Sequence, residues 1–245
     1  MPVRILAFET STRHSSVALM EGTQVTATAQ LDKTRPTAAY LVPTIKRLLS
    51  DAQWASQSIE VIACSLGPGS FTGLRIGLVT AKVWARFSGA QLVGVPTFDV
   101  VAQQAQDALA TRQPDLHAAA ARIVIVVPAA RNLFFLGAFD ADRRGELVPA
   151  EPARLVDSLD PLHDQPPGSW LSGTWLERCS PPQRAALATR FRLIPAEAWY
   201  PRAETVARLA RHRAADHRFD SPLELEPIYI RPSYVDEHRA GPETA

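Results

Sequence analysis

The sequence is poor in cysteine and has no excess charge of either sign. Among its 245 residues are only two cysteines, Cys64 and Cys179, which excludes a disulfide framework as the source of stability. The 26 basic residues nearly cancel the 25 acidic ones, so no net attraction draws the chain to nucleic acid or to an anionic membrane. Cys64 lies in an apolar run and is expected to be a buried free thiol.

Long apolar stretches are missing too. No stretch approaches the roughly 18 uninterrupted apolar residues of a membrane-spanning helix. Met1–Arg4 leads into a strand-like run without the pattern of a signal peptide. Together with the low cysteine content, these features predict a cytoplasmic protein without a membrane partner.

Motifs for metal binding and for nucleophilic catalysis are also absent. None of the six histidines stands four residues from another, so no helix-borne metal pair is expected. No nucleophile elbow and no cysteine–histidine arrangement is visible. We therefore expect neither catalytic residues nor a metal site in this chain.

The first half of the chain alternates short apolar runs with helical patterns. Apolar residues spaced by three and four predict an amphipathic helix over 37–50, with Thr37 as its N-cap. Pro43 should bend this helix or mark a later start. We expect a meander of strands at 3–8, 15–20 and 24–31, further strands at 60–66 and 91–95, and helices at 72–87 and 98–109.

The second half opens like the first, with an apolar strand, a turn and another strand. This repetition favours a duplicated α/β unit with a boundary within 111–121. We expect strands at 123–127 and 133–139, a hairpin turn at 140–145 leading into 146–148, a Pro-rich loop at 160–168 and an Arg-rich helix at 205–215.

A glycine-rich turn, Gly67-Pro68-Gly69-Ser70-Phe71-Thr72-Gly73, joins the expected strand at 60–66 to the next helix. Free N–H groups at the helix start could hold an anion. The Gly-Lys-Ser/Thr ending of a Walker loop is missing, so a tight strand-to-helix turn is the simpler interpretation.

Small residues recur every four positions along the helix expected at 72–87. Gly73, Gly77, Ala81 and Ala85 would form a strip on one face that allows close approach. The strip either packs against this chain's own sheet and first helix, or it docks a second chain. The sequence favours neither interpretation.

The first strand ends in a carboxylate followed by hydroxyls, Glu9-Thr10-Ser11-Thr12. These groups could hold a metal–phosphate, but Ser and Thr also bond their own backbone, and a capped turn is the simpler interpretation. Arginines are dense over 178–218, which is typical of an exposed charged helix and less often of an RNA-facing patch.

Residues 3–20, 65–86 and 226–231 resemble the TsaB (YeaZ) family. Its members are partner subunits in bacterial synthesis of N6-threonylcarbamoyladenosine at position 37 of tRNA. The resemblance rests on the runs Ile5–Thr12 and Ser16–Leu19, more heavily on Gly67–Gly77, and on Glu226-Pro227-Ile228-Tyr229-Ile230-Arg231.

The resemblance implies a two-lobed actin-like ATPase (ASKHA) fold, an α/β architecture of duplicated ribonuclease-H-like mixed sheets flanked by helices. Residues 1–110 would form the N-terminal lobe, which docks the partner. Residues 111–245 would form a smaller C-terminal lobe that ends in a segment returning to the N-terminal lobe.

The resemblance also implies a non-catalytic scaffold or activating subunit for threonylcarbamoyl transfer to N6 of adenosine 37. The chemistry would lie in a larger paralogue, TsaD, which binds metal through a His-x-x-x-His pair that is absent here, and an ATPase subunit, TsaE, would join the assembly. The chain would contact tRNA only as part of the complex. No cofactor would be tightly bound, and ATP or ADP with magnesium would belong to the assembled complex alone. An isolated copy could form a homodimer.

In the family the two early helices, here at 37–50 and 72–87, form a bundle with the partner. The docking residues expected from this are Thr37, Leu41, Ile45, Leu48, Thr72, Gly73, Ile76, Gly77, Thr80, Ala81, Trp84 and Ala85. The residues expected near an anion or nucleotide are Glu9, Thr10, Ser11, Gly67, Gly69 and Ser70. This chain departs from the family's pattern at three places. It has Glu9 where the family usually has aspartate, Ala129 where the family has the aspartate of an Asp-Ala-Arg run, and Pro36-Thr37 where the family has His-Ser.

Two other functions are compatible with the sequence. A phosphotransferase of the sugar- and acetate-kinase type shares the fold and would use Glu9 and the glycine-rich turn, but Ala129 replaces an acidic residue that it needs. A peptidase, an older label in this superfamily, would need a metal pair or an activated nucleophile, and neither is visible.

Overall fold

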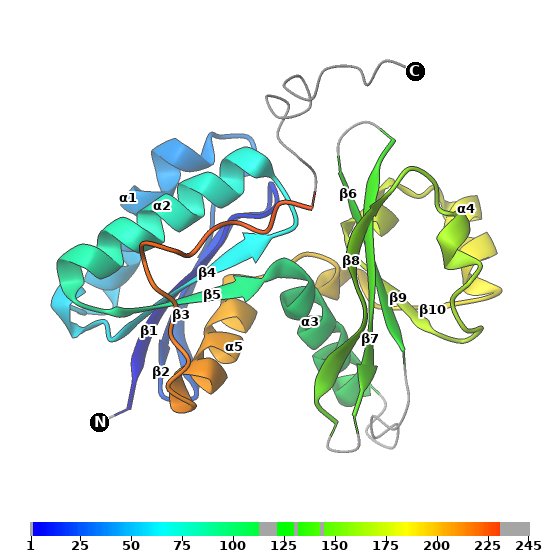
Figure 1. The fold of residues 1–245 in the computed structure, drawn as a ribbon. Helices are drawn as coiled ribbons and strands as arrows, with labels where there is room; N and C mark the ends of the chain where they lie inside the picture. Colours follow the sequence, from blue (N-terminus) through cyan, green and yellow to red (C-terminus); the bar gives the residue numbers. More distant parts are fainter. Residues whose placement is uncertain (1, 113–121, 130–131, 143–144, 231–245) are drawn as a thin grey trace, which may run out of the picture.

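A computed structural model describes residues 2–112, 122–129, 132–142 and 145–230. Figure 1 shows two lobes side by side, each built around one mixed β-sheet. Most of the expected boundary at 111–121 lies outside the described residues, as do Ala130, Arg131, Arg143, Arg144 and Arg231.

The first lobe contains a five-stranded sheet in the order β3-β2-β1-β4-β5. β1, β2 and β3 form an antiparallel meander, β4 runs parallel to β1, and β5 runs parallel to β4. The expected strands of this half are confirmed. Their bounds are Arg4–Glu9 for β1, Ser16–Glu21 for β2, Gln24–Gln30 for β3, Val61–Gly67 for β4 and Gln91–Pro96 for β5.

The second lobe repeats this topology strand for strand. Its order is β10-β9-β6-β7-β8, with β6, β7 and β8 antiparallel and with β9 and β10 continuing parallel to β6. The two-lobed actin-like fold with duplicated mixed sheets is therefore confirmed. The bounds are Ile123–Pro128 for β6, Phe134–Ala141 for β7, Leu147–Val156 for β8, Trp170–Ser172 for β9 and Arg192–Leu193 for β10.

Helices cover both faces of the first sheet. Successive residues of a strand point to opposite faces, and in β1 Leu6 and Phe8 pack toward α1 and α2 whereas Ile5 and Ala7 pack toward α5. A strand buried on both faces is apolar throughout, which explains the continuous apolar run of β1. The helices are α1 (Thr37–Asp51), α2 (Phe71–Ser88), α3 (Thr97–Arg112), α4 (Pro181–Ala188) and α5 (Ala203–Ala215).

The chain crosses between the lobes twice. α3 leaves the first sheet and packs on β6 and β8 of the second, and α5 returns to pack on β1, β2, β4 and β5. Beyond α5, the segment from Asp220 to Ile230 runs along the first lobe beside α2 (Figure 1). It is held by the Asp220 amide on the Leu92 carbonyl oxygen and by the Ile228 amide on the Leu66 carbonyl oxygen, each at 2.8 Å.

Several local predictions need correction. The N-cap of α1 is Pro36, and Thr37 is the first helical residue and makes no capping hydrogen bond. The helix does not start late but runs through Pro43. The turn expected at 140–145 is shorter, because Asp140 and Ala141 belong to β7. The loop at 160–168 contains a short 3-10 helix, η2 (Asp160–Leu162). Further 3-10 helices are η1 (Ser56–Ser58), η3 (Thr174–Arg178) and η4 (Ala196–Ala198).

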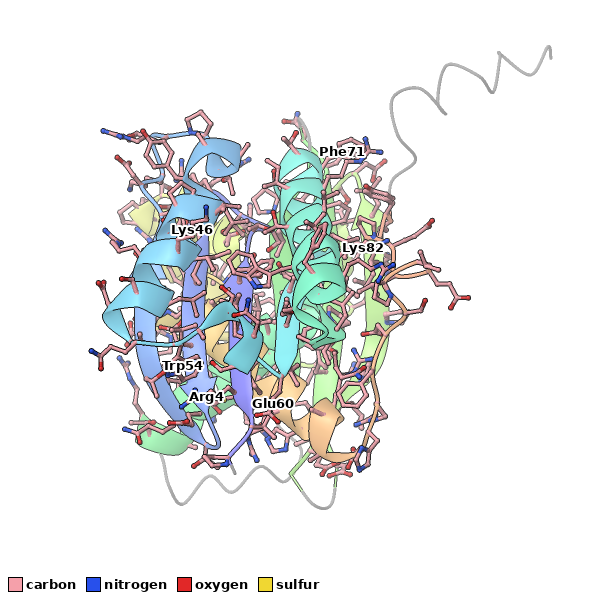
Figure 2. All side chains as sticks on the ribbon, turned by 90° about the vertical axis from the view of Figure 1, so that its left-hand side faces the viewer. Arg4, Lys46, Trp54, Glu60, Phe71 and Lys82 are labelled. Atoms are coloured by element: carbon pink, nitrogen blue, oxygen red, sulfur yellow. The ribbon has the colours of Figure 1, made fainter. Side chains whose placement is uncertain are left out.

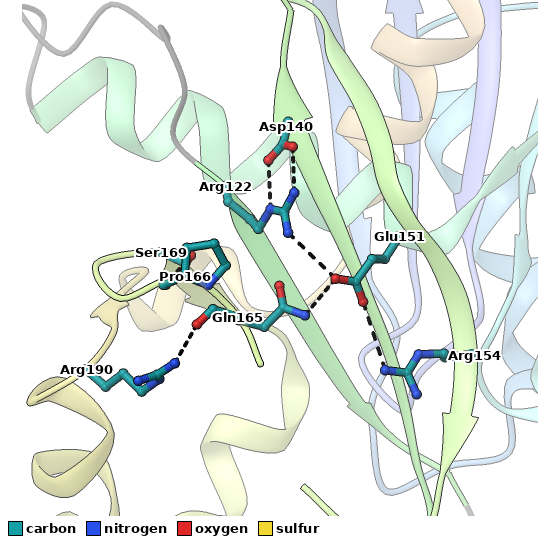
Figure 3. Close-up of polar contacts among 8 residues, drawn as sticks. All are labelled: Arg122, Asp140, Glu151, Arg154, Gln165, Pro166, Ser169 and Arg190. Carbon is teal, nitrogen blue, oxygen red and sulfur yellow. Dashed lines mark hydrogen bonds and ion pairs between the residues drawn. The ribbon is translucent and has the colours of Figure 1, made fainter. Parts of the chain in front are cut away.

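A polar network anchors the Pro-rich loop to the second sheet (Figure 3). Arg122 binds Asp140 through two hydrogen bonds of 3.0 and 2.8 Å and lies 3.6 Å from Glu151. Gln165 Nε2 donates to the same Glu151 carboxylate at 2.8 Å, and Arg190 donates to the Gln165 carbonyl oxygen. These contacts fix the loop against β7 and β8.

Among the described residues, every helix is too short or too polar to cross a lipid bilayer.

Candidate partner-docking surface

The glycine-rich turn packs tightly against the loop that follows β1. The Ser70 amide donates to the Ser11 carbonyl oxygen over 2.7 Å, and a Cβ added at Gly69 would lie 2.4 Å from that oxygen. Gly67 has a φ of +106°, and a Cβ there would lie 2.8 Å from Leu74. The glycines thus allow one loop of this chain to approach another, which supports the interpretation as a tight turn.

The strip of small residues on α2 faces inward. Gly73, Gly77, Ala81 and Ala85 are all buried. A Cβ at Gly73 would lie 2.1 Å from the Thr10 carbonyl oxygen, and one at Gly77 would lie 2.2 Å from Thr10 Oγ1. Of the two interpretations of the strip, the structure supports close packing within the chain, because the loop after β1 occupies the space that a partner would need.

Many of the residues expected to form a docking surface are buried inside the first lobe. Leu41, Ile45 and Leu48 of α1 are buried in the core of the first lobe together with the strip of α2. Thr37, Ile76, Thr80 and Trp84 are half-buried, and Thr72 is exposed. The buried members can hold the two helices in place, but they present no side chain to a second protein.

The opposite face of α2 exposes a row of large apolar side chains. Val79, Val83 and Phe87 are 58%, 51% and 86% exposed and follow one another at four-residue spacing. In a helix of 3.6 residues per turn, this row lies about 160° around the axis from the buried strip. We call these three residues the outer stripe. α2 is therefore apolar on two faces, one toward the sheet and one toward solvent.

α1 lies beside α2 and extends this surface (Figure 2). Its outward residues include Ala38, Ala39 and Pro43, which are exposed, with Lys46 and Arg47 following toward the C-terminal end. Lys46 is labelled on α1 in Figure 2. The two helices together form a surface with an apolar centre on α2 and cationic residues around it.

The carboxylate at the end of β1 is enclosed. Glu9 is fully buried, its Oε1 accepts the Ser11 amide, and its Oε2 has no partner among the described residues. Burial raises the pKa of this carboxyl group, although hydrogen bonds from Ser11, Ser65 and Thr12 oppose the shift. Thr10 Oγ1 and Ser11 Oγ are likewise buried without a partner. A carboxyl group without accessible surface is a poor ligand for a metal–phosphate.

The loop after β1 is tied to the second lobe. Arg13 Nη2 lies 2.9 Å from Glu177 Oε2, and the Tyr200 hydroxyl donates to the same oxygen. The His14 ring stacks on the Tyr200 ring. These contacts join the two lobes at the end of β1.

A shallow groove of about 360 Å³ runs between α2 and the segment 225–229. Its wall on the α2 side includes Arg75, Val79 and Lys82, and its opposite wall includes Glu226 and Tyr229. Arg75 lies over the Phe71 ring at 3.9 Å and donates from Nε to the Tyr229 hydroxyl at 2.9 Å. The groove opens onto the outer stripe through Val79.

Most arginines of the dense stretch are engaged within the chain. Arg208 pairs with Asp107 at 3.0 Å, and Arg213 pairs with Asp220 at 3.1 Å. Arg190 donates to two carbonyl oxygens, and Arg192 lies over the Trp170 ring. This arrangement matches the interpretation as a charged helix and flanking loops more closely than an RNA-facing patch.

The described residues contain no group of three or more His, Cys, Asp or Glu side chains that could hold a metal ion. The predicted buried state of Cys64 is confirmed, and burial raises the pKa of its thiol to about 12. A thiol with such a pKa stays protonated near neutral pH and is a poor nucleophile.

The outer stripe was missed by the sequence interpretation, although its signal is present. Val79, Val83 and Phe87 repeat every four residues, as the small residues do, but on the other side of the same helix. An apolar row on both sides of one helix indicates two packing partners. The sheet supplies only one of them.

Comparison with known proteins gives a consistent result. A family model described as TsaD, tRNA N6-adenosine threonylcarbamoyltransferase, matches residues 33–130. The tRNA threonylcarbamoyladenosine biosynthesis protein TsaB of Escherichia coli strain K12 is 26% identical over 98% of this chain and 100% of its own length. Among solved structures, YeaZ from Pseudomonas aeruginosa has a TM-score of 0.72 at 23% identity, covering 93% of this chain and 99% of that one. A Pseudomonas aeruginosa protein described by its similarity to peptidase YEAZ has a TM-score of 0.73 at 24% identity, covering 94% and 100%.

Proposed function

We propose that this chain, a member of the TsaB (YeaZ) family, takes part in tRNA threonylcarbamoyladenosine biosynthesis as a docking subunit and is not an enzyme by itself. Its partner is the larger paralogue of the TsaD type, which supplies the transfer chemistry at N6 of adenosine 37. Similarity to a TsaB protein along the whole chain supports the pathway.

The observation that carries the docking role is the outer stripe of α2. Three large apolar side chains on consecutive turns of one helix are exposed to water, and burying them against a second protein would be favourable by about 25 cal/mol for each Å² of apolar area. The stripe lies on a helix that is held rigidly from below by the packing of Gly73 and Gly77 on Thr10. A rigid helix with an apolar outer face is a suitable element for a helical interface.

The same geometry favours a subunit without chemistry of its own. The kinase-like alternative would need an accessible carboxylate and an open glycine loop. Glu9 is fully buried, and Thr10 and Ser11 occupy the space beside the glycines. The peptidase alternative would need a nucleophile, and the thiol of Cys64 is buried.

The remaining parts of the assembly follow from the family. We propose that TsaE joins the complex in the cytoplasm, that tRNA is bound only by the complex, and that ATP or ADP with magnesium belongs to the assembled state. An isolated copy would cover its outer stripe by forming a homodimer through the same helices.

The test is co-purification with the TsaD-type paralogue from the same genome. Val83→Glu places a charge in the centre of the outer stripe and should abolish the complex, because burial of an unpaired carboxylate is costly. Val148→Glu is a matched control, since Val148 is 43% exposed on β8 in the other lobe. Ala81→Glu would be uninformative, because Ala81 is fully buried in this chain and the change would disrupt folding.

A complex that forms with the wild-type chain and with Val148→Glu, but not with folded Val83→Glu, would support the docking role. A complex retained by Val83→Glu would exclude the outer stripe. If the wild-type chain and its paralogue do not associate at all, while the isolated chain binds ATP in calorimetry, the kinase-like function gains support instead.

A further inference from the structure

We infer that the groove between α2 and the segment 225–229 receives an acidic side chain of the docking partner. This inference rests on the proposed docking function and adds the chemistry that the partner must present. It is carried by two cations, Arg75 and Lys82, that line the groove and have no ion-pair partner among the described residues.

Arg75 is held in a fixed orientation. Its guanidinium carbon lies 3.9 Å over the Phe71 ring and 5.8 Å from the centre of the Tyr229 ring, and its Nε donates to the Tyr229 hydroxyl. A guanidinium that is already ordered loses little conformational entropy when it binds a carboxylate, and its remaining N–H groups match the planar geometry of that anion.

Lys82 supplies a second positive charge on the same wall, one turn beyond Leu78. It is half-buried and lies on the flank of α2 toward the segment 225–229 (Figure 2). Glu226 is the acidic residue of the lining, and it forms no ion pair with either cation. The groove therefore has a net positive charge, which favours an anionic occupant.

The position of the groove favours a protein side chain as that occupant. Val79 belongs both to the groove and to the outer stripe, so a helix seated on the stripe would pass the mouth of the groove. A partner helix with apolar residues against the stripe and one Asp or Glu at its edge would bury both kinds of group together. RNA is disfavoured, since the groove opens onto the apolar outer stripe, which offers no partner for further phosphates.

The experiment measures the dissociation constant of the full-length chain and its TsaD-type paralogue by titration calorimetry at low and at high salt. Lys82→Met keeps the aliphatic stem and removes the charge, and Lys82 has no hydrogen-bond partner among the described residues that the fold would lose. Arg178→Met is the matched control, because Arg178 is exposed on η3 in the second lobe and lies outside the groove.

We expect Lys82→Met to raise the dissociation constant about tenfold at low salt and by a smaller factor at high salt. The dissociation constant of the control variant should stay within about twofold of the wild-type value. Arg75→Gln should show the same pattern with a larger loss. If Lys82→Met, Arg75→Gln and the control all bind as tightly as wild type while Val83→Glu still abolishes the complex, the inference about the groove is wrong and the docking function stands.

Other outcomes also decide the question. If Lys82→Met and Arg178→Met weaken binding equally, the overall charge of the chain and not the groove is responsible, and the inference is wrong. If Lys82→Met leaves partner affinity unchanged but reduces tRNA retention by the complex, the groove contacts RNA and the inference is also wrong. Absence of any complex with the wild-type chain would remove the proposed function and this inference together.

Discussion

The imidazole ring of His14 stacks on the phenol ring of Tyr200, with centroids 3.8 Å apart and an interplanar angle of 29°. The two residues belong to different parts of the fold, since His14 follows β1 and Tyr200 follows η4. The neighbouring pair Arg13 and Glu177 joins the same two parts. The loop after β1 is thus held from the side of the second lobe, close to Glu9.

Removal of the Tyr200 ring should loosen the two lobes. We expect Tyr200→Ala to lower the free energy of unfolding by about 3 kcal/mol, because it removes both the stacked ring and the hydroxyl that donates to Glu177. Tyr200→Phe keeps the ring and should cost about 1 kcal/mol or less. Urea denaturation measures both values, and equal losses in the two variants would show that stacking contributes nothing.

The close approach of α2 to Thr10 predicts an energetic coupling. Gly77→Ala should destabilise the chain by about 2 kcal/mol in spite of the higher helix propensity of alanine, since the new Cβ would lie 2.2 Å from Thr10 Oγ1. Thr10→Ala removes that oxygen, so the double variant should be more stable than the sum of the single changes predicts.

Gly73→Ala is the control for this coupling. Its Cβ would lie 2.1 Å from the Thr10 carbonyl oxygen, which Thr10→Ala leaves in place. Thr10→Ala should therefore rescue Gly77→Ala but not Gly73→Ala. Equal rescue of both, measured by denaturation of the three single and two double variants, would contradict the packing described for α2.

Asp99 should make stability depend on pH. Burial raises its pKa to about 6, although Arg213 opposes the shift. Between the ordinary carboxyl pKa of 3.8 and about 6, the unfolded chain has released this proton while the folded chain still holds it, so the free energy of unfolding falls as pH rises. Asp99→Asn should remove this slope, and the difference between the two proteins across the window should be on the order of 2 kcal/mol. Identical pH profiles for the two proteins would refute the burial of this carboxyl group.

Neither cysteine should react with a thiol reagent in the folded protein. Cys64 is fully buried, Cys179 is 5% exposed, and burial raises the pKa of both thiols. We expect almost no reaction with an aromatic disulfide reagent in native buffer and two thiols per chain in guanidinium chloride. Fast release of one equivalent in native buffer would place a reactive thiol at the surface.

The strands of the first lobe were predictable because their physical signal is strong. β1 and β4 are buried on both faces, and each gives a continuous apolar run that ends at turn residues. The start of α1 was assigned less well. Thr37 has the side chain of an N-cap residue, but Pro36 takes the cap position and no side-chain bond forms.

The end of the second lobe gave little signal for a different reason. β9 has three residues and β10 has two, which is too short for alternation to be recognised. α4 is also short, but Ser180 and Gln183 form a capping box that can be read directly as Ser-x-x-Gln. The start of α4 could therefore have been predicted from this motif.

The docking surface could be assigned to a helix but not to a face of it. The spacing of Gly73 and Gly77 identifies a strip on α2, yet spacing alone does not say what the strip contacts. The contact is Thr10, more than sixty residues earlier, and only the parallel pairing of β1 with β4 brings it there. The outer stripe follows once that inward contact is known.

The return of α5 to the first sheet has a consequence for synthesis on the ribosome. A nascent chain that has emerged only as far as residue 112 has made every strand of the first sheet, but Ile5, Ala7, Val61 and Ala63 still lack Val206, Ala207 and Ala210 of α5 as their cover. The first lobe is thus the first to begin folding and the last to be completed. A chain terminated before residue 203 would leave an uncovered apolar sheet face, which makes premature termination products of this gene prone to aggregate.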